Sequence, residues 1–508
     1  MPERRMQIQA PPRAGGSHRV SRCRDRHAFA FLGALLIAAY FLALAGPGLG
    51  AGFTTDDLVN LSGYWNQSPA ALFKAVALYF SPSYRPLGGL LFYRPLFALA
   101  GFNPVPYRLF CFTLLLGNLG LLYFAILCIT NSSEIAALTT LIGAFHPKLV
   151  DLYWNNGTIY DILCYTFYLG ALSYYGRARR NGPILNLRQA LTFLTLYVAA
   201  LDSKEMAVTL PLLPILYELI YFPPARFGIR QVGQWSATNC RLPAIAAAMT
   251  APYVWFKLLP VSPFGQLSSY HLEITLRHFL ASYGAYLDFL FYRDRWFGET
   301  PTSVLLAAML VVALLLKSRH LVFAWSFLVV SFLPIAFVPT RDAYVLYIPL
   351  VGWSLYIAVL LVSLRSAILP SRKPIWAGKT LQVALFLLAL VLLLRAYRVQ
   401  RLRMYGELTL GQPVIRSVLA ELDRRHTNLP RGARILVIND PLPHPYELPL
   451  LLRLYLRDGT LEIDHGSSDD GRHTYVMIWR GTSLHVIDYH LNAPMGLRRV
   501  QQTGRRTT

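Results

Sequence analysis

Long apolar runs alternate with short polar connections along most of this chain. A helix needs about 20 apolar residues to cross the hydrocarbon core of a bilayer, and most of the runs are close to that length. The pattern predicts an α-helical polytopic membrane protein with about eleven transmembrane helices. The predicted spans are residues 28–50, 106–129, 134–150, 158–176, 187–201, 206–222, 241–259, 303–316, 320–338, 343–364 and 379–396.

Basic residues mark one side of this arrangement. If the Arg-rich tail 1–27 is cytoplasmic, the alternation of spans places four basic connections on the inner side, and none of them contains an acid. Such an excess of Lys and Arg is typical of cytoplasmic loops. It also explains much of the net charge of +22, so this charge gives no support for a nucleic-acid partner. The four connections are 177–186, 223–240, 317–319 and 365–378.

Two outer segments do not fit the simple alternation. Residues 51–105 form a long predicted outer loop with short interfacial helices at Leu58–Trp65 and Pro69–Phe80. The stretch 273–292 is helical in pattern but carries Arg277, His278 and Asp288. It is predicted to be an amphipathic helix at the outer interface, and a membrane crossing there is the open alternative.

The C-terminal part, 397–508, differs in kind because it is charged and has no apolar run of spanning length. It is predicted to be a small extracytoplasmic α/β domain beside the membrane domain 28–396. Its expected helices are 413–426 and 447–457, and its expected strands are 434–439, 475–479 and 483–488. The five Cys of the chain are scattered, which argues against a disulfide framework or a zinc site.

Five polar motifs fall together on the predicted outer side. Ionisable groups at membrane boundaries are costly and often mark a functional site. Each also has a structural explanation: the Asp pair suits the first turn of a helix, Lys and Arg can extend to the interface, and His-Pro can end a helix. The motifs are Asp56-Asp57, Tyr84-Arg85-Pro86-Leu87, His146-Pro147 with Asp161, Asp202-Ser203-Lys204-Glu205, and Arg341-Asp342-Ala343-Tyr344 with Tyr347.

In order and character these motifs resemble the C-type (GT-C) glycosyltransferase superfamily. The nearest likeness is to the dolichyl- or polyprenyl-phosphate-mannose-dependent O-mannosyltransferases of the transmembrane-and-TPR-containing type. The resemblance covers about residues 30–396. The chain departs from the pattern in two ways: it has no basic residue at 157–161, and the short α/β domain replaces the TPR array.

The resemblance implies inverting transfer of a sugar, with mannose as one candidate, from a polyprenyl-phosphate carrier to an acceptor hydroxyl. Such a reaction needs a carboxylate base and cations for the leaving phosphate. Asp56 or Asp57 would be catalytic, with Asp56 favoured as the base. The predicted donor-phosphate ligands are Arg85, Lys204, Arg341 and Tyr347, and the predicted substrate-binding residues are His146, Asp161, Glu205 and Tyr344.

The predicted partners are a polyprenyl-phosphate-linked sugar, the lipid bilayer, and a protein, lipid or glycan acceptor. No cofactor is expected; a divalent metal is an open alternative, because an adjacent Asp pair could hold one. The predicted location is a bacterial inner membrane, with the active site on the extracytoplasmic face. The rival functions are a lipid-linked sugar transporter or flippase and a non-catalytic membrane scaffold. A transporter would place its charged groups nearer the midplane, in two related halves.

Overall fold

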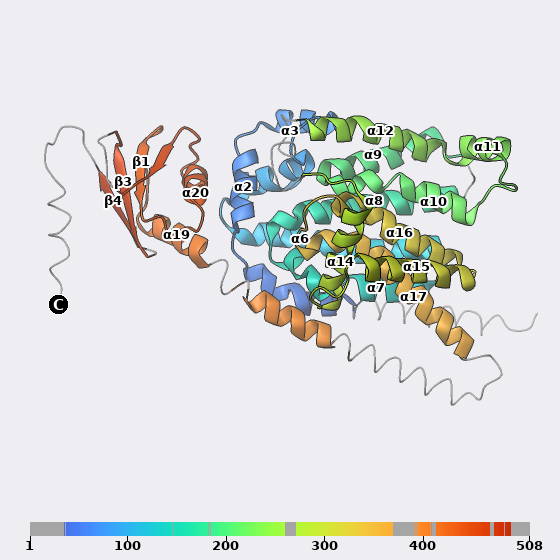
Figure 1. Cartoon of the computed structure of the whole chain (residues 1–508). Helices are drawn as coiled ribbons and strands as arrows, with labels where there is room; N and C mark the ends of the chain where they lie inside the picture. The colour runs from blue at the N-terminus through green and yellow to red at the C-terminus, as the bar shows by residue number, and fades with distance from the viewer. Residues whose placement is uncertain are drawn as a thin grey trace, which may run out of the picture.

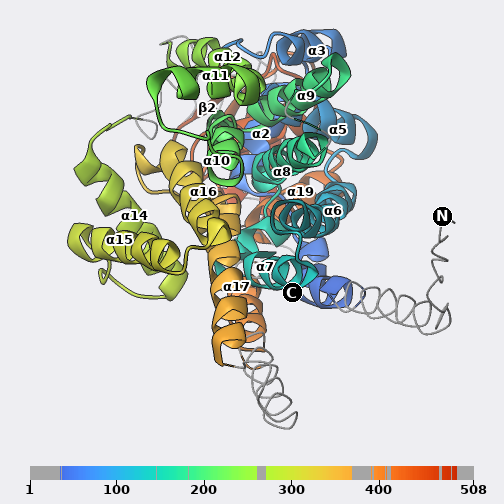
Figure 2. The ribbon, with the colours of Figure 1, turned by 90° about the vertical axis from the view of Figure 1, so that its right-hand side faces the viewer.

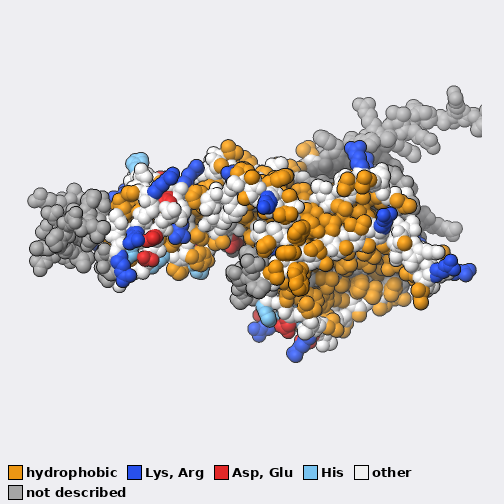
Figure 3. Space-filling view, turned by 90° about the horizontal axis from the view of Figure 1, so that it is seen from above, with side chains coloured by type: hydrophobic (Ala, Val, Ile, Leu, Met, Phe, Trp, Pro, Cys, Tyr) orange, Lys and Arg blue, Asp and Glu red, His pale blue; other side chains and the backbone are white. Residues whose placement is uncertain are grey.

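The computed structural model consists of a helical body with a small sheet at one end (Figure 1). It describes residues 35–259, 271–368, 391–408, 413–467 and 472–488, apart from positions 36, 145, 181, 183, 392, 393, 407 and 482. The predicted cytoplasmic tail 1–27 and most of the predicted span 379–396 lie outside these residues. Hydrophobic side chains dominate the visible flank of the body, and charged side chains gather on the sheet domain and at the edges of the body (Figure 3).

The long helices of the body run side by side, and Figure 2 views several of them end-on. Each overlaps one of the predicted apolar runs. They are α6 (Pro104–Thr130), α7 (Ser133–Ala144), α8 (Ile159–Arg179), α9 (Leu187–Ser203), α10 (Leu212–Tyr221), α12 (Arg241–Leu258), α15 (Glu299–Leu315), α16 (Arg319–Ala336) and α17 (Pro349–Ile368). The main packed pairs are α6 with α8, α8 with α9, and α16 with α17.

Three of these helices, α6, α16 and α17, are long and apolar enough to cross a membrane. Among the described residues the number rises to five if two bent helix pairs each count as one span. The structure thus supports an integral membrane protein, and the total of eleven spans stays a prediction.

Several of the predicted spans are broken near prolines, and one of them, 343–364, is divided into the 3₁₀ helix η7 (Ala343–Tyr347) and α17, which begins at Pro349. The run 134–150 ends as α7 at Ala144 and continues, bent by 76°, as the 3₁₀ helix η3 (Pro147–Tyr153). The run 206–222 is divided into η5 (Glu205–Thr209) and α10, which begins only after Pro211. Proline lacks the N–H that a helix interior needs, so the backbone hydrogen-bond ladder is interrupted at these positions.

Short helices cover the ends of the long ones on the side of the sheet domain. Helix α2 (Thr55–Tyr64) stands across these ends next to the sheet domain (Figure 1). It follows a 76° bend after the first apolar helix, Ile37–Gly50, which ends in η1 (Gly46–Gly50). The others here are α3 (Pro69–Ala77), α4 (Pro86–Gly88), the π-helical turn η2 (Gly89–Tyr93) and α5 (Arg94–Ala100).

The remaining pieces complete the body. They are η4 (Asn156–Thr158), α11 (Ile229–Asn239), α14 (Leu276–Phe291) and η7 (Ala343–Tyr347). Helix α14 occupies the predicted amphipathic segment and packs against α15 and α16. Its Asp288 is buried and accepts hydrogen bonds from the backbone N–H groups of Trp296 and Phe297, at 3.0 and 3.2 Å. This local role explains a carboxylate within an otherwise apolar helix.

The C-terminal part folds as a small α/β unit. Its four-stranded sheet has the order β2-β1-β3-β4, with β1 parallel to β2 and β3, and β3 antiparallel to β4. The predicted helices and strands are confirmed; within the described residues of this unit the sequence interpretation missed β2, an exposed edge strand with one apolar residue. The elements are α19 (Pro413–Arg424), β1 (Arg434–Ile438), α20 (Glu447–Tyr455), β2 (Glu462–His465), β3 (Tyr475–Arg480) and β4 (Ser483–Asp488).

Helix α20 attaches this unit to the body by packing on α2. The Thr55 hydroxyl of α2 donates a 2.6 Å hydrogen bond to Glu447, which is fully buried at the start of α20. A second link joins the Arg416 guanidinium of α19 to the carbonyl of Gly50 at 2.6 Å. Both links lie beside the first turn of α2.

Candidate active site

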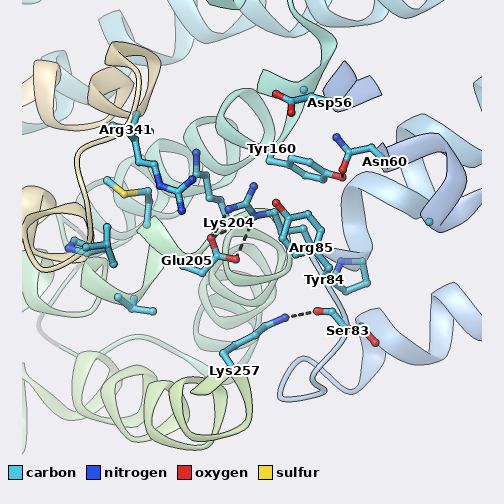
Figure 4. Close-up of a pocket in the computed structure, with 18 of the residues that line it drawn as sticks. Asp56, Asn60, Ser83, Tyr84, Arg85, Tyr160, Lys204, Glu205, Lys257 and Arg341 are labelled. Carbon is cyan, nitrogen blue, oxygen red and sulfur yellow. Dashed lines mark hydrogen bonds and ion pairs between the residues drawn. The ribbon is translucent and has the colours of Figure 1, made fainter. Parts of the chain in front are cut away.

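A cavity of about 820 Å³, shown in Figure 4, lies at the ends of the long helices next to α2, which forms part of its wall. Its size suits a small ligand or a substrate headgroup. Among the predicted site residues, those that line it are Asp56, Arg85, Lys204, Glu205, Arg341 and Tyr344. The polar motifs are separated by up to 285 positions in the sequence (56 to 341), and the fold brings at least one member of four of the five motifs to this cavity.

Asp56 lies in the first turn of α2 with its side chain open to the cavity. The loop before α8 supports it from behind: Asn155 donates a hydrogen bond to the carboxylate. A Cβ at Gly157 would lie 3.1 Å from the Asp56 Cβ, so glycine allows the loop to approach. The cavity wall removes part of the hydration of Asp56 and raises its pKa, and the nearby Asp342 adds to this rise. Asp56 is therefore a fixed carboxylate with increased basicity.

Asp57 turns the other way and does not line the cavity. Its carboxylate accepts from the backbone N–H of Thr54 at 2.9 Å and completes a capping box with the Thr54 side chain. Asn156 donates to the same oxygen at 3.3 Å. The side chain is fully buried, and burial raises the pKa of Asp57 to about 6, although the buried guanidinium of Arg108 partly opposes the rise. The capping explanation fits Asp57, whereas Asp56 faces the open space.

Arg85, which is buried, and Glu205, which is partly buried, form an ion pair on another side of the cavity from Asp56 (Figure 4). The guanidinium uses two nitrogens: Nη2 donates to Oε2 at 2.8 Å, and Nε to Oε1 at 3.2 Å. Burial opposes ionisation of Glu205, but the charge and hydrogen bonds of Arg85 outweigh it, so the pKa of Glu205 is below its ordinary value. Two-pronged pairing fixes the direction of the guanidinium as well as neutralising charge.

The backbone and two aromatic rings also hold Arg85 in place. Its φ of +38° is left-handed, which is unusual for a residue with a side chain, and Pro86 follows it at the start of α4. The guanidinium carbon lies 4.7 Å from the ring centroid of Tyr84 and 5.0 Å from that of Tyr160. Such cation–π contacts stabilise a charge that has lost part of its hydration.

Lys204 forms a second, buried ion pair. Its Nζ lies 2.6 and 2.7 Å from the two carboxylate oxygens of Asp161 on α8, and 5.1 Å from the ring centroid of Tyr344. Lys204 itself lines the cavity, while Asp161 lies behind it. Asp161, which is predicted to bind substrate, contacts the lining residue Lys204 in this structure and does not itself line the cavity.

The sequence interpretation missed one lining cation, Lys257 in the last turn of α12, whose Nζ donates to the carbonyl of Ser83. A lone Lys near the end of an apolar run was the only available signal, and it is equally typical of a residue that reaches for the interface. Asp342, Tyr84, Tyr160 and Asn60 also line the cavity without having been predicted as site residues.

The structure does not bring His146 and Tyr347 into the cavity. The Nδ1 of His146 accepts from the backbone N–H of Lys148 at 3.2 Å and caps η3, and its ring lies parallel to Tyr292. Tyr347 is buried and stacks on Tyr165, with ring centroids 3.8 Å apart. Both residues belong to predicted motifs, and in this structure their side chains make capping and packing contacts away from the cavity.

Different parts of the cavity are lined by cationic, acidic and apolar side chains. Arg85, Lys204 and Arg341 reach toward one part of it, and Asp56 stands on another side (Figure 4). A third region is apolar and lies between α12, η5 and the end of α16; it is lined by Val254, Leu258, Met206, Val208, Pro334, Ile335 and Val338. The described residues contain no cluster of three or more His, Cys, Asp or Glu placed for a metal ion, and the two adjacent Asp side chains diverge.

Comparisons with known proteins find a likeness to solved structures over most of the chain. No protein-family model and no curated protein matches the sequence. Among solved structures, the crystal structure of ArnT from Cupriavidus metallidurans bound to undecaprenyl phosphate covers 87% of this chain and 86% of its own, at 15% identity and a TM-score of 0.47. A likeness of this degree carries no argument about activity, so the function is argued from the site itself.

Proposed function

We propose that this protein is a membrane glycosyltransferase that moves a sugar from a polyprenyl-phosphate carrier to an acceptor hydroxyl on the extracytoplasmic side. One observation carries the proposal: a single cavity holds a carboxylate with raised pKa on one side and a group of fixed cations on another, and joins both to an apolar region. The resemblance of the motifs to GT-C glycosyltransferases supports the same reaction class.

In the proposed reaction the acceptor oxygen attacks the anomeric carbon of the donor sugar. Asp56 takes the hydroxyl proton while the new carbon–oxygen bond forms. The bond between the anomeric carbon and the phosphate oxygen breaks, and its electron pair leaves with the polyprenyl phosphate. Attack from the side opposite the leaving group inverts the configuration at the anomeric carbon.

The cations stabilise the charge that develops on the leaving phosphate. Arg85 and Lys204 are each held by a carboxylate partner, so they need little reorientation when the charge appears. Arg341 approaches from the loop before η7 (Figure 4). Preorganised groups of this kind act more strongly in a poorly hydrated cavity than in water.

The apolar region of the cavity would receive the first isoprene units of the carrier. It adjoins Lys257 and begins between α12 and α16, two helices of the body. Burying a hydrocarbon chain there gives binding energy remote from the reacting bond.

The direct test is sugar transfer by the purified protein in liposomes. Labelled polyprenyl-phosphate sugars would be supplied with cell-envelope extract as the acceptor. We expect donor consumption that matches the appearance of labelled product and of free polyprenyl phosphate. Movement of intact donor across the bilayer without cleavage would contradict the proposal and support a transporter.

Transfer is expected to fall at acidic pH, with the fall centred above the ordinary pKa of an aspartate. The base must be ionised, and burial followed by the charge of Asp342 raises the pKa of Asp56, although Arg85 and Arg341 partly oppose the rise. Activity is thus present above this raised pKa and is lost as pH falls through it. The measurement is the pH profile of kcat/KM for wild type and Asp342→Asn.

Removing the negative charge at position 342 should move the acidic limb of that profile to lower pH. An unchanged limb in Asp342→Asn would mean that a group other than Asp56 controls the profile.

A further inference from the structure

An exposed aromatic pair stands beside α2 at the edge of the C-terminal unit. The rings of His444 and Tyr446 lie parallel at an interplanar angle of 5°, with centroids 5.4 Å apart. Both side chains are exposed, and 48% of the Tyr446 surface is accessible. Neither residue lines the cavity, and the function proposed above gives them no role.

The surrounding loop is built to hold this pair. Pro441, Pro443 and Pro445 alternate with Leu442, His444 and Tyr446, and each proline fixes its own φ. Leu442 is buried in the core, and its N–H donates to Asp440 at 2.9 Å. The loop is thus fixed at one end by Leu442 and at the other by α20, so the two exposed rings are presented with little freedom.

Contacts with α2 place the pair close to the proposed base. Tyr446 directly precedes Glu447, whose carboxylate accepts the 2.6 Å hydrogen bond from Thr55. Thr55 in turn directly precedes Asp56. The charges of Glu447 and Asp56 add to the effect of burial in raising the pKa of Tyr446, so the phenol is within electrostatic reach of the base.

The same loop lies at a favourable edge of the sheet. It follows the carboxyl end of β1. The chain continues from β1 to β2 on one side of the sheet and from β3 to β4 on the other, so the connections diverge between β1 and β3. Ligands of open α/β sheets bind outside the carboxyl ends of the strands at such a point. Polar groups are available there: Asp440 after β1 and His465 at the end of β2 lie 2.8 Å apart, Oδ2 to Nε2.

We propose that the His444–Tyr446 pair binds the acceptor of the transferase and that this acceptor is a carbohydrate. The inference rests on the proposed function. Flat exposed rings fit the C–H face of a pyranose, and Asp and His side chains can bind its hydroxyl groups. A sugar stacked on the pair would approach Asp56 from the side of the C-terminal unit, while the donor phosphate binds at the cations within the cavity.

The test uses the full-length protein in liposomes with labelled donor and envelope extract as acceptor, with variants at the pair. For Tyr446→Ala and His444→Ala we expect the acceptor concentration for half-maximal transfer to rise about tenfold, an effect typical of losing an aromatic contact. The donor concentration for half-maximal transfer should not change. Tyr446→Phe retains the ring and should behave as wild type. Tyr405→Ala, at another exposed tyrosine, is the matched control.

Treatment of the extract identifies the acceptor class. Periodate cleaves sugar diols and should abolish acceptor capacity, whereas protease should leave it intact. If only protease removed the acceptor capacity of the extract, the acceptor would be a peptide and the inference would be overturned. The inference would also be overturned if Tyr446→Ala and His444→Ala needed the same acceptor concentration for half-maximal transfer as wild type. In both cases wild type still transfers sugar and the proposed function stands. Absence of transfer to every fraction, with no donor consumed, would instead refute the proposed function.

Discussion

Asp56→Asn is expected to lower the rate of sugar transfer by about 10²–10⁴-fold, the usual contribution of a positioned general base. The amide has nearly the same shape as the carboxylate but cannot take the acceptor proton. Because Asp56 is open to the cavity and does not form the capping box of α2, the substitution should leave folding unchanged. The measurement is single-turnover transfer in liposomes, with thermal unfolding recorded on the same preparation.

Asp57→Asn is the matched control, one position along the same helix turn. Asp57 caps α2 through Thr54 and is fully buried, so this variant should lose stability but retain much of its transfer rate. A collapse of transfer in Asp57→Asn with normal transfer in Asp56→Asn would keep the reaction class and assign the base to Asp57. Wild-type transfer in both variants would contradict catalysis by this Asp pair.

Arg85→Ala is expected to lower transfer by about 10²–10³-fold, the effect of removing one preorganised group that stabilises developing charge. The variant also leaves Glu205, whose side chain is 25% exposed, without its guanidinium partner. Removing one member of a largely buried ion pair destabilises a protein, so loss of activity alone would not separate the two effects. Transfer and the free energy of unfolding must both be measured.

The double variant Arg85→Ala/Glu205→Ala separates catalysis from folding. Removing both partners takes away the unpaired charge, so stability should recover relative to Arg85→Ala. Transfer should not recover, because the cation facing the phosphate is still missing. If transfer returned together with stability, Arg85 would have a purely structural role, and the leaving phosphate would have to depend on Lys204, Arg341 or Lys257.

The helical body could be predicted from the sequence because apolar runs of spanning length have few alternatives in a membrane. The predicted ranges 106–129 and 158–176 correspond closely to α6 and α8. Errors occur where a proline interrupts an apolar run, as at Pro147, Pro211 and Pro349. A hydropathy average does not detect a proline within an apolar run, but the missing N–H of that proline interrupts the backbone hydrogen bonds of the helix.

The candidate site was predictable as a set of motifs but not as a set of side chains. The alternation of spans places the motifs on one side, and the structure brings Asp56, Arg85 and Arg341 to one cavity. The direction of each side chain depends on local packing that the sequence pattern does not contain. Adjacent residues such as Asp56 and Asp57 point to different surroundings because successive positions on a helix lie about 100° apart.

The contact between α2 and α20 has a consequence for how this protein matures. The hydrogen bond from Thr55 to Glu447 spans 392 positions of the chain, so its two halves leave the ribosome far apart in time. Chains are made from the N-terminus, and a pairing with such sequence separation forms late. The helix that carries Asp56 therefore stays without the support of Glu447 during most of synthesis, until the C-terminal α/β unit has been made and has docked on α2.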